Sequence, residues 1–359
     1  MSHDTRVLLP SNLPPLTIGV DLGDRTSRTC ELDAQGRCVR EASVATTEAA
    51  MRRYLAARPR CRVVFETCTH SPWLARLVTA LGHEVVVANP SAMFTRGARR
   101  RRNDALDAQF LARQGRADVA LLHPITHRSA AAQRDLAQLR ARDQLVKART
   151  QLINHVRGAV KAVGQRVSAC SAESFARRAR AEVPEGLVPA LTPLVEVIET
   201  LTRQIHATDR ALAQLIAQHY PVARHLQQTA GVGVLTALAY VLLVDDPTRF
   251  RRSRDAGAYF GLVPRLDESS TATPQLRISK AGDALGRRLL VSAAQYILGP
   301  FGPACDLRRH GQAIAERGGK NAKKRAVVAV ARKLAVLLHH LWITGAAYDP
   351  DYLVHRRSA

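Results

Sequence analysis

Four acidic residues in the first third of the chain have types and spacings suited to binding a metal ion. Asp104 and Asp107 are three residues apart, so in a helix their carboxylates share one face. Asp21 and Glu66 each end a short apolar segment that predicts a buried strand. Carboxylate oxygens are the ligands that Mg²⁺ and Mn²⁺ prefer, and a pair of such ions could promote phosphodiester cleavage. The plain alternative for each acid is an ordinary strand end or a solvated helix face.

The predicted secondary structure around these acids alternates between strands and helices. After a strand over 16–21, further strands and helices are expected at 28–33, 37–44, 47–57, 62–66, 71–81 and 83–88. An initial hairpin followed by strand–helix alternation indicates an α/β domain with a mixed sheet, over residues 16–125. In open α/β sheets, ligands bind beyond the carboxyl ends of the strands, so we expect the four carboxylates to converge there.

The amino-acid composition predicts a polyanionic partner. The 53 lysines and arginines outnumber 30 acidic residues and give a formal net charge of +23, which is typical of nucleic-acid-binding proteins. A GC-rich genome would explain arginine in place of lysine, but not the excess of cations over anions. The 6 cysteines have no Cys-x-x-Cys spacing, and the sequence has no hydrophobic signal segment and no apolar run of membrane length. We therefore expect a cytoplasmic protein with no membrane partner.

Three short motifs carry the four acids. They are Ile18-Gly-Val-Asp21, Glu66-Thr-Cys68 and Arg102-Asn-Asp104-Ala-Leu-Asp107-Ala108. In this order they resemble the DEDD transposases of the insertion-sequence one-ten family, which includes the Piv-type DNA invertases. The family commonly has lysine where Arg102 stands, a change that keeps the positive charge. The resemblance implies an RNase H-like (RuvC-like) domain in which Asp21, Glu66, Asp104 and Asp107 are catalytic and bind Mg²⁺ or Mn²⁺.

The middle of the chain, over residues 126–225, is expected to be helical. In the segment 187–219 the apolar residues alternate steps of three and four, which predicts a heptad seam. The seam consists of Leu191, Leu194, Ile198, Leu201, Ile205, Leu212 and Leu215, with Thr208 as a polar interruption. This helix and an amphipathic segment over 129–165 could form a hairpin within the chain or a coiled coil with another protomer, and the sequence leaves both open. In the resembled family this region is a coiled coil that contributes to assembly.

Three further parts of the chain are expected from the sequence. Residues 226–345 are expected to form a mainly α C-terminal transposase domain, residues 1–15 a flexible arm and residues 346–359 a tail.

Two motifs in the C-terminal domain match the family pattern. Gly261-Leu-Val-Pro264 and Ile278-Ser-Lys-Ala-Gly282 flank a polar segment that contains Ser269 and Ser270. In the family, a serine at this place is the nucleophile that becomes joined to DNA. The spacing to both motifs favours Ser269, with Ser270 as the alternative nucleophile, and Ser270 stands where the family usually has glycine. Taken alone, the segment predicts only a polar loop, because activation of a nucleophile depends on its surroundings.

Basic residues in three parts of the chain are candidates for contact with nucleic acid. They are Arg99, Arg100, Arg101, Arg102, Arg265, Arg277, Lys280, Lys320, Lys323, Lys324 and Arg325. Most are expected to contact phosphates without reading sequence. Arg265, Arg277 and Lys280 flank the serine segment and could also stabilise charge on a reacting phosphoryl group.

The resemblance implies a DNA transposase or site-specific recombinase that cuts and rejoins donor and target DNA through a phosphoserine link. It further implies a homo-oligomer, a dimer or a tetramer, and a structured (bridge) RNA that guides the protein by pairing with DNA. The low aromatic content, 4%, suits backbone binding better than base stacking. Two rivals stay open: a RuvC-like metal-dependent junction nuclease without a covalent serine step, and a catalytically inactive, basic nucleic-acid-binding scaffold.

Overall fold

The computed structural model describes residues 14–90, 104–265 and 276–358. The chain divides into two compact units, with the boundary between His127 and Arg128. The first unit holds the sheet together with the helices that cover it, whereas the second unit is helical.

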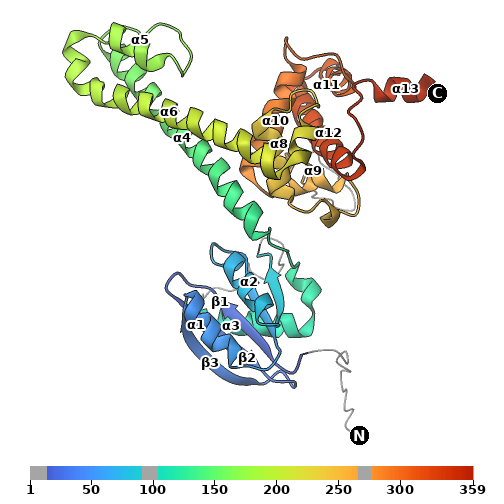
Figure 1. Ribbon diagram of the computed structural model, residues 1–359. Helices are drawn as coiled ribbons and strands as arrows, with labels where there is room; N and C mark the ends of the chain where they lie inside the picture. The colour runs from blue at the N-terminus through green and yellow to red at the C-terminus, as the bar shows by residue number, and fades with distance from the viewer. Residues whose placement is uncertain (1–13, 91–103, 266–275, 359) are drawn as a thin grey trace. The chain divides into compact units, whose positions relative to one another are not determined.

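The first unit is built on a five-stranded mixed sheet (Figure 1). The strands lie in the order β3-β2-β1-β4-β5. Their bounds are Thr17–Asp21 for β1, Thr26–Leu32 for β2, Cys38–Ala45 for β3, Arg62–Glu66 for β4 and Glu84–Ala88 for β5. β1, β2 and β3 pair antiparallel, whereas β1, β4 and β5 are parallel. The predicted mixed sheet with an initial hairpin is therefore confirmed.

Helices bury both faces of this sheet. Val63 and Phe65 of β4 pack in the same core as α1 (Glu48–Ala56) and α2 (Ser71–Ala80). Val64 packs instead with α3 (Asp104–Ala117) and the short turn η2 (Val119–Leu122). Successive strand residues point to opposite faces, so a strand that is covered on both sides is an uninterrupted apolar run. This explains the continuous apolar segments in the sequence.

Helix α3 lies directly on β1 because β1 has a glycine at the contact. A Cβ atom on Gly19 would lie 2.0 Å from the carbonyl oxygen of Ala108 and 2.9 Å from the Cβ of Ala112. The two backbones therefore meet with no room for a side chain. Close packing of this kind holds the helix at one height along the strand.

Contacts at the C-terminal end of α3 set the direction of the helix. The carbonyl of Gly115 accepts a hydrogen bond of 2.7 Å from Nη1 of Arg62, the first residue of β4. Arg116 donates to the carbonyl of Ala34, in the turn that follows β2. Both partners lie at the edge where β1 and β4 begin. The N-terminal turn of α3 therefore points toward the carboxyl ends of these strands.

The second unit contains two long antiparallel helices, α4 (Ala130–Ala162) and α6 (Val188–His219), which lie side by side (Figure 1). Nε of Arg142 binds Oδ1 of Asp209 at 2.8 Å, and Nη1 of Arg149 donates to Oγ1 of Thr202 at 3.3 Å. The predicted seam faces α4 and includes the buried residues Leu191, Ile198, Ile205 and Leu212. The seam thus packs within the chain. Assembly through a coiled coil between protomers stays a prediction.

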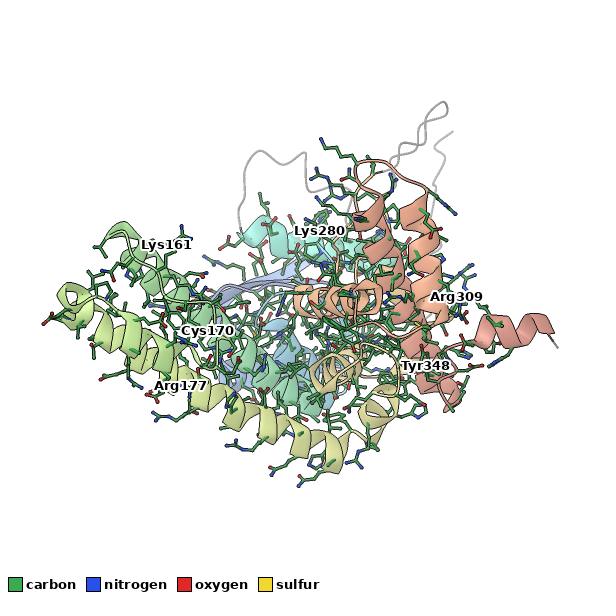
Figure 2. The ribbon with its side chains drawn as sticks, turned by 90° about the horizontal axis from the view of Figure 1, so that it is seen from above. Lys161, Cys170, Arg177, Lys280, Arg309 and Tyr348 are labelled. Atoms are coloured by element: carbon green, nitrogen blue, oxygen red, sulfur yellow. The ribbon has the colours of Figure 1, made fainter. Side chains whose placement is uncertain are left out.

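A small cap covers one end of the α4–α6 pair. It consists of α5 (Phe175–Glu182) and the turn η3 (Glu185–Leu187). Phe175 is fully buried and packs in one cluster with Val156 and Ile198 of the long helices. Lys161, Cys170 and Arg177, labelled in Figure 2, lie at this end of the unit.

The second unit has α8 (Val234–Val244) in its core, together with further helices that follow and precede it in the chain. They are α7 (Pro221–Leu226), η4 (Pro247–Arg249), α9 (Asp255–Tyr259), α10 (Ala284–Leu298), α11 (Asp306–Glu316), α12 (Ala322–Thr344) and α13 (Tyr352–Ser358). Every residue of α8 from Thr236 to Val244 is buried. Its Tyr240 stacks on Phe260, with ring centroids 5.2 Å apart, and donates a hydrogen bond of 2.7 Å to the carbonyl of Ala335. These contacts join α8 to α12 in one core.

Helix α12 passes the length and composition test for a membrane span, and among the described helices it is the one that does. Its apolar residues Val330, Leu334 and Leu338 are fully buried in the core of the second unit. Arg332 and Lys333 interrupt its middle and are exposed, and charged residues are costly at the centre of a bilayer. We interpret α12 as a core helix.

The residues after α12 contact α11, which the sequence did not indicate. The amide of Asp306 donates to the carbonyl of Pro350 at 2.8 Å, and Arg309 contacts Asp351 at 2.6 Å. Arg309 and Tyr348 are labelled in Figure 2. This part of the expected tail is therefore joined to the C-terminal helices.

We predict that Gly19→Ala destabilises the protein by about 2–3 kcal/mol, because overpacking of a filled contact commonly costs about 1–3 kcal/mol. Urea unfolding of the full chain, followed by fluorescence and circular dichroism, measures the change. Gly158→Ala is the matched control, since a Cβ there meets nothing within 4 Å and helix propensity should stabilise α4 by about 0.5–1 kcal/mol. Equal stability of wild type and Gly19→Ala would show that α3 does not depend on this contact.

Candidate active site

Asp21 and Glu66 end neighbouring parallel strands. β1 and β4 pair in register up to Val20 and Phe65, so these two acids come next on the two strands. Asp21 shares the face of Gly19, and Glu66 shares the face of Val64, because strand residues two apart point the same way. That face is the one that α3 covers. Both carboxylates are half-buried and lie on the α3 side of the carboxyl edge.

Asp104 and Asp107 form the first turn of α3 and come to the same height. From the contact between Gly19 and Ala108, Asp21 lies two residues along β1, or about 6.6 Å. Asp104 lies four residues back along α3, or about 6 Å at 1.5 Å per residue, in the same direction. Asp107 is half-buried and Asp104 is exposed. The structure thus brings the four predicted acids to one edge and one face of the sheet.

The chemistry of this donor set fits a hard divalent cation. All four side chains end in carboxylate oxygens, the donors that Mg²⁺ and Mn²⁺ bind. Among the described residues, no three of these four acids place oxygen atoms within 4.8 Å of one another. Rotation about the side-chain bonds would let these carboxylates close around a bound cation.

One further residue at this edge, His70, is not part of the predicted set. His70 lies in the loop that follows β4, and its Nε2 is 3.7 Å from Oδ1 of Asp24, in the loop that follows β1. Nε1 of Trp73 donates a hydrogen bond of 3.2 Å to Nδ1 of His70 and orients the ring. The signal in the sequence is its place four residues after Glu66. His70 is therefore positioned beside the acidic edge.

In the second unit, a short two-stranded base flanks the predicted serine segment. Pro264 and Ile278 form an antiparallel bridge, and the amide of Arg265 donates to the carbonyl of Arg277 at 3.0 Å. The chain therefore leaves and re-enters this base at adjacent positions. Ser269 and Ser270 lie between them and outside the described residues.

The base is held by close backbone contacts. A Cβ on Gly261 would lie 2.1 Å from the carbonyl oxygen of Ala281, and one on Gly282 would lie 2.0 Å from that of Tyr259. Both glycines also have positive φ, 66° and 77°, which side chains disfavour. Nη1 of Arg287 donates to three nearby carbonyls, those of Phe260, Lys280 and Ala281, at 3.0–3.3 Å. The glycines of both family motifs are thus required by the geometry.

The predicted cationic residues are exposed wherever the structure describes them. They are Arg265, Arg277 and Lys280 at the base, and Lys320, Lys323, Lys324 and Arg325 at the start of α12. Arg99, Arg100, Arg101 and Arg102 lie outside the described residues. Near α12, burial and the positive charges of Lys333 and Arg317 lower the pKa of His310.

The mixed sheet, with acidic side chains at the carboxyl ends of β1 and β4, fits the RNase H-like class of catalytic domain. Residues 18–164 match the model of the DEDD transposase domain of the IS110 type, which is described as a transposase. Residues 223–304 match the model described as transposase, IS116/IS110/IS902 family. The chain belongs to the IS110 family of transposases and is an enzyme that cleaves and transfers DNA. The resemblance found in the sequence is confirmed.

Curated relatives extend the similarity over nearly the whole chain. The transposase for insertion sequence element IS1111A of Coxiella burnetii is 30% identical over an alignment of 337 residues, and the match covers 89% of this chain and 88% of the relative. The transposase for insertion sequence element IS1328 of Yersinia enterocolitica is 29% identical and covers 80% of this chain and 85% of its own. A probable family 20 transposase of Pseudomonas aeruginosa is 26% identical, with 93% and 98% covered. DEDD transposase domains use divalent metal ions.

We predict that Asp107→Asn lowers DNA cleavage more than about 100-fold, because even changes outside the metal's own ligands cost about 10–100-fold. Cleavage of DNA that carries the element ends, at fixed Mg²⁺, measures the effect, and thermal unfolding checks the fold. Glu48→Gln, an exposed acid on α1, is the control and should cleave as wild type does. If Asp107→Asn and Asp21→Asn both cleaved DNA as fast as the wild type, these two acids would not belong to the active site.

We also predict that Lys320→Ala, Lys323→Ala and Lys324→Ala together weaken DNA binding equally on specific and unrelated sequences. Each lost phosphate contact should reduce the slope of log K against log salt by about 0.9. Fluorescence anisotropy across a salt series measures this slope. Arg52→Ala is the control, since Arg52 already binds Glu48 at 2.8 Å. An unchanged slope in the triple variant would place the DNA elsewhere.

Proposed function

We propose that the chain is a cytoplasmic DNA recombinase that joins donor and target DNA through a covalent phosphoserine intermediate at a composite site. The observation that carries the proposal is the contact of α3 with Gly19, which sets the first turn of α3 beside the carboxyl ends of β1 and β4. The closed base that flanks the segment with Ser269 supports the second half of the chemistry.

Asp21, Glu66, Asp104 and Asp107 would hold Mg²⁺, or Mn²⁺, at this edge. When bound, such an ion supplies positive charge that neutralises a scissile phosphate and its leaving oxygen. The acids themselves position that charge, since two are fixed by strand ends and two by one helical turn. The run from Arg99 to Arg102 directly precedes α3 in sequence and would bind the DNA backbone nearby.

Ser269 would act as the nucleophile of the first transfer, with Ser270 as the alternative. Its Oγ forms a bond to the DNA phosphorus, the bond from phosphorus to one deoxyribose oxygen breaks, and the proton of the serine hydroxyl ends on that oxygen. A DNA hydroxyl from the other partner then attacks the phosphoserine and releases the serine. Each step exchanges one phosphodiester for another, so the reaction needs no external energy source.

Arg265 and Arg277 would stabilise the reacting phosphate. These two exposed arginines lie next to each other, one on each arm of the base that flanks the serine segment. Guanidinium groups bind phosphate oxygens in pairs and remain charged at any physiological pH. Lys280, two residues after the bridge, adds a third cation.

A structured guide RNA and a homo-oligomer, dimer or tetramer, complete the proposal. The chain carries a net charge of +23, and aromatic residues make up only 4% of it. Such a composition suits a protein that holds nucleic-acid backbones while base pairing supplies specificity. In the oligomer, the acidic edge of one protomer would act with the serine segment of another.

The test is capture of a covalent protein–DNA adduct in the presence of Mg²⁺, with element-end DNA and the RNA transcribed from the element. Wild type should give an adduct that survives denaturation and maps by mass spectrometry to Ser269. Ser269→Ala should abolish the adduct but keep Mg²⁺-dependent thermal stabilisation. Ser292→Ala, an exposed serine on α10, is the control and should react as wild type does.

Four outcomes would change the proposal. Strand exchange that persists in both Ser269→Ala and Ser270→Ala would contradict the serine step. Metal-dependent cleavage without an adduct or strand exchange would favour the junction nuclease, in which water replaces serine. If the wild type showed no cleavage and no Mg²⁺-dependent stabilisation, the binding scaffold would be favoured. Full activity after ribonuclease treatment would show that the reaction needs no guide RNA.

A further inference from the structure

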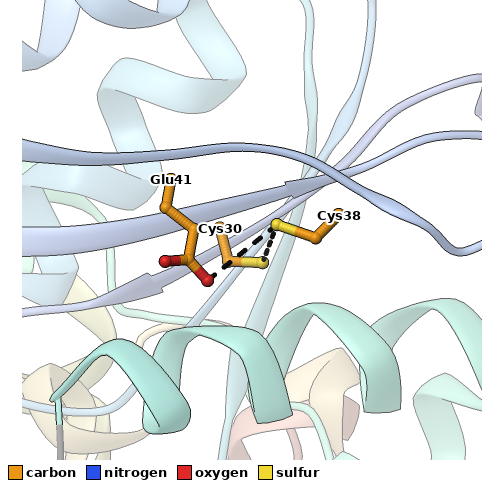
Figure 3. Close-up of side chains that lie close together, drawn as sticks. All are labelled: Cys30, Cys38 and Glu41. Atoms are coloured by element: carbon orange, nitrogen blue, oxygen red, sulfur yellow. Dashed lines mark hydrogen bonds between the residues drawn. The ribbon is translucent and has the colours of Figure 1, made fainter.

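Two cysteines and a glutamate meet on the edge hairpin of the first unit (Figure 3). Cys30 lies on β2, and Cys38 and Glu41 lie on β3. Cys30 pairs with Glu41 across the hairpin, and the register then shifts so that Leu32 pairs with Cys38. In a regular strand, residues three apart point to opposite faces. The bulge therefore brings Cys38 to the face of Cys30 and Glu41, as bulges commonly re-aim a side chain.

The three donor atoms lie within 4.8 Å of one another, close enough to bind one metal ion. The two Sγ atoms are 3.6 Å apart, and Sγ of Cys38 is 3.9 Å from Oε1 of Glu41. With zinc bonds of about 2.3 Å to sulfur and about 2.0–2.2 Å to oxygen, tetrahedral ligand atoms lie about 3.5–3.8 Å apart. A disulfide would need the sulfurs to approach to about 2.05 Å. The sulfur–sulfur separation falls in the range for ligands of one ion, and the sulfur–oxygen separation is slightly longer.

We propose that Cys30, Cys38 and Glu41 form a binding site for a thiophilic divalent cation, Zn²⁺, distinct from the acidic edge. Binding replaces the protons of two thiols, so one Zn²⁺ enters and two protons leave, while the carboxylate binds as it is. A solvent molecule takes the fourth position, because Cys38 and Glu41 are exposed and give the ion a path of entry.

The position of this site gives it a structural role under α3. Cys30 is fully buried and packs in one cluster with Leu32, Ala108 and Ala112. Ala108 and Ala112 are the two residues of α3 that contact Gly19. An ion that joins β2 to β3 at Cys30 therefore stiffens the surface on which the helix with Asp104 and Asp107 lies.

The test uses the full chain, kept reduced with a phosphine, stripped of metal with a chelator and titrated with Co²⁺. The proposed site should take up one Co²⁺ per chain, with an intense near-ultraviolet band from thiolate-to-cobalt charge transfer and the visible bands of a tetrahedral ion. Carboxylate ligands at the acidic edge give no thiolate band, so the two sites are distinguished. Zn²⁺ should then displace the Co²⁺ and abolish both signals.

Cys38→Ser should weaken cobalt binding at least about 10-fold and remove most of the thiolate band. Because the side chain of Cys38 is exposed, the substitution should not disturb the fold. Thermal unfolding of Cys38→Ser checks this. Cys68→Ser, an exposed cysteine of the same unit, is the matched control and should keep the full band. A wild-type chain without the band, or a band that is equal in Cys38→Ser, overturns the proposal. So does quantitative formation of a Cys30–Cys38 disulfide in air when Zn²⁺ is present at saturation.

Discussion

The contact between Gly19 and α3 is the constraint on which the acidic edge depends. Two acids belong to strands that neighbour each other, so their proximity follows from pairing alone. The other two belong to a helix, and their height relative to the strands is decided where the carbonyl of Ala108 meets Gly19. A one-residue slide of the helix would move Asp104 and Asp107 by about 1.5 Å and rotate them by about 100°. The glycine removes that freedom.

The second unit uses the same means at the serine segment. Gly261 and Gly282 allow two backbone segments to pack directly against each other. Nη1 of Arg287 donates to the carbonyls of Lys280 and Ala281 in the same loop. These hydrogen bonds tie the loop to α10, on which Arg287 lies. In both units, positions that lack a side chain set the place of the residues that are expected to react.

Charge in this protein is divided between structure and surface. Several arginines that composition assigns to nucleic acid bind protein groups instead. Arg142 pairs with Asp209, and Nη1 of Arg308 donates to the carbonyls of Ile297, Gly299 and Gly302 at 2.7–2.9 Å. A net charge of +23 still remains for the surface. Composition therefore predicts the kind of partner correctly but overstates how many arginines can contact it.

The sequence by itself determined the strands that carry Asp21 and Glu66, the spacing of Asp104 and Asp107, and the family, because these depend on local pattern and short motifs. It also identified the seam of α6, because a heptad pattern predicts which face of a helix is buried, whichever element packs against that face. Tertiary structure decided what covers that face, the direction of α3, and the contact of residues 350 and 351 with α11. It also decided the meeting of Cys30, Cys38 and Glu41, which depends on a bulge. These features join residues far apart in sequence or depend on a single register shift, and no local pattern encodes either.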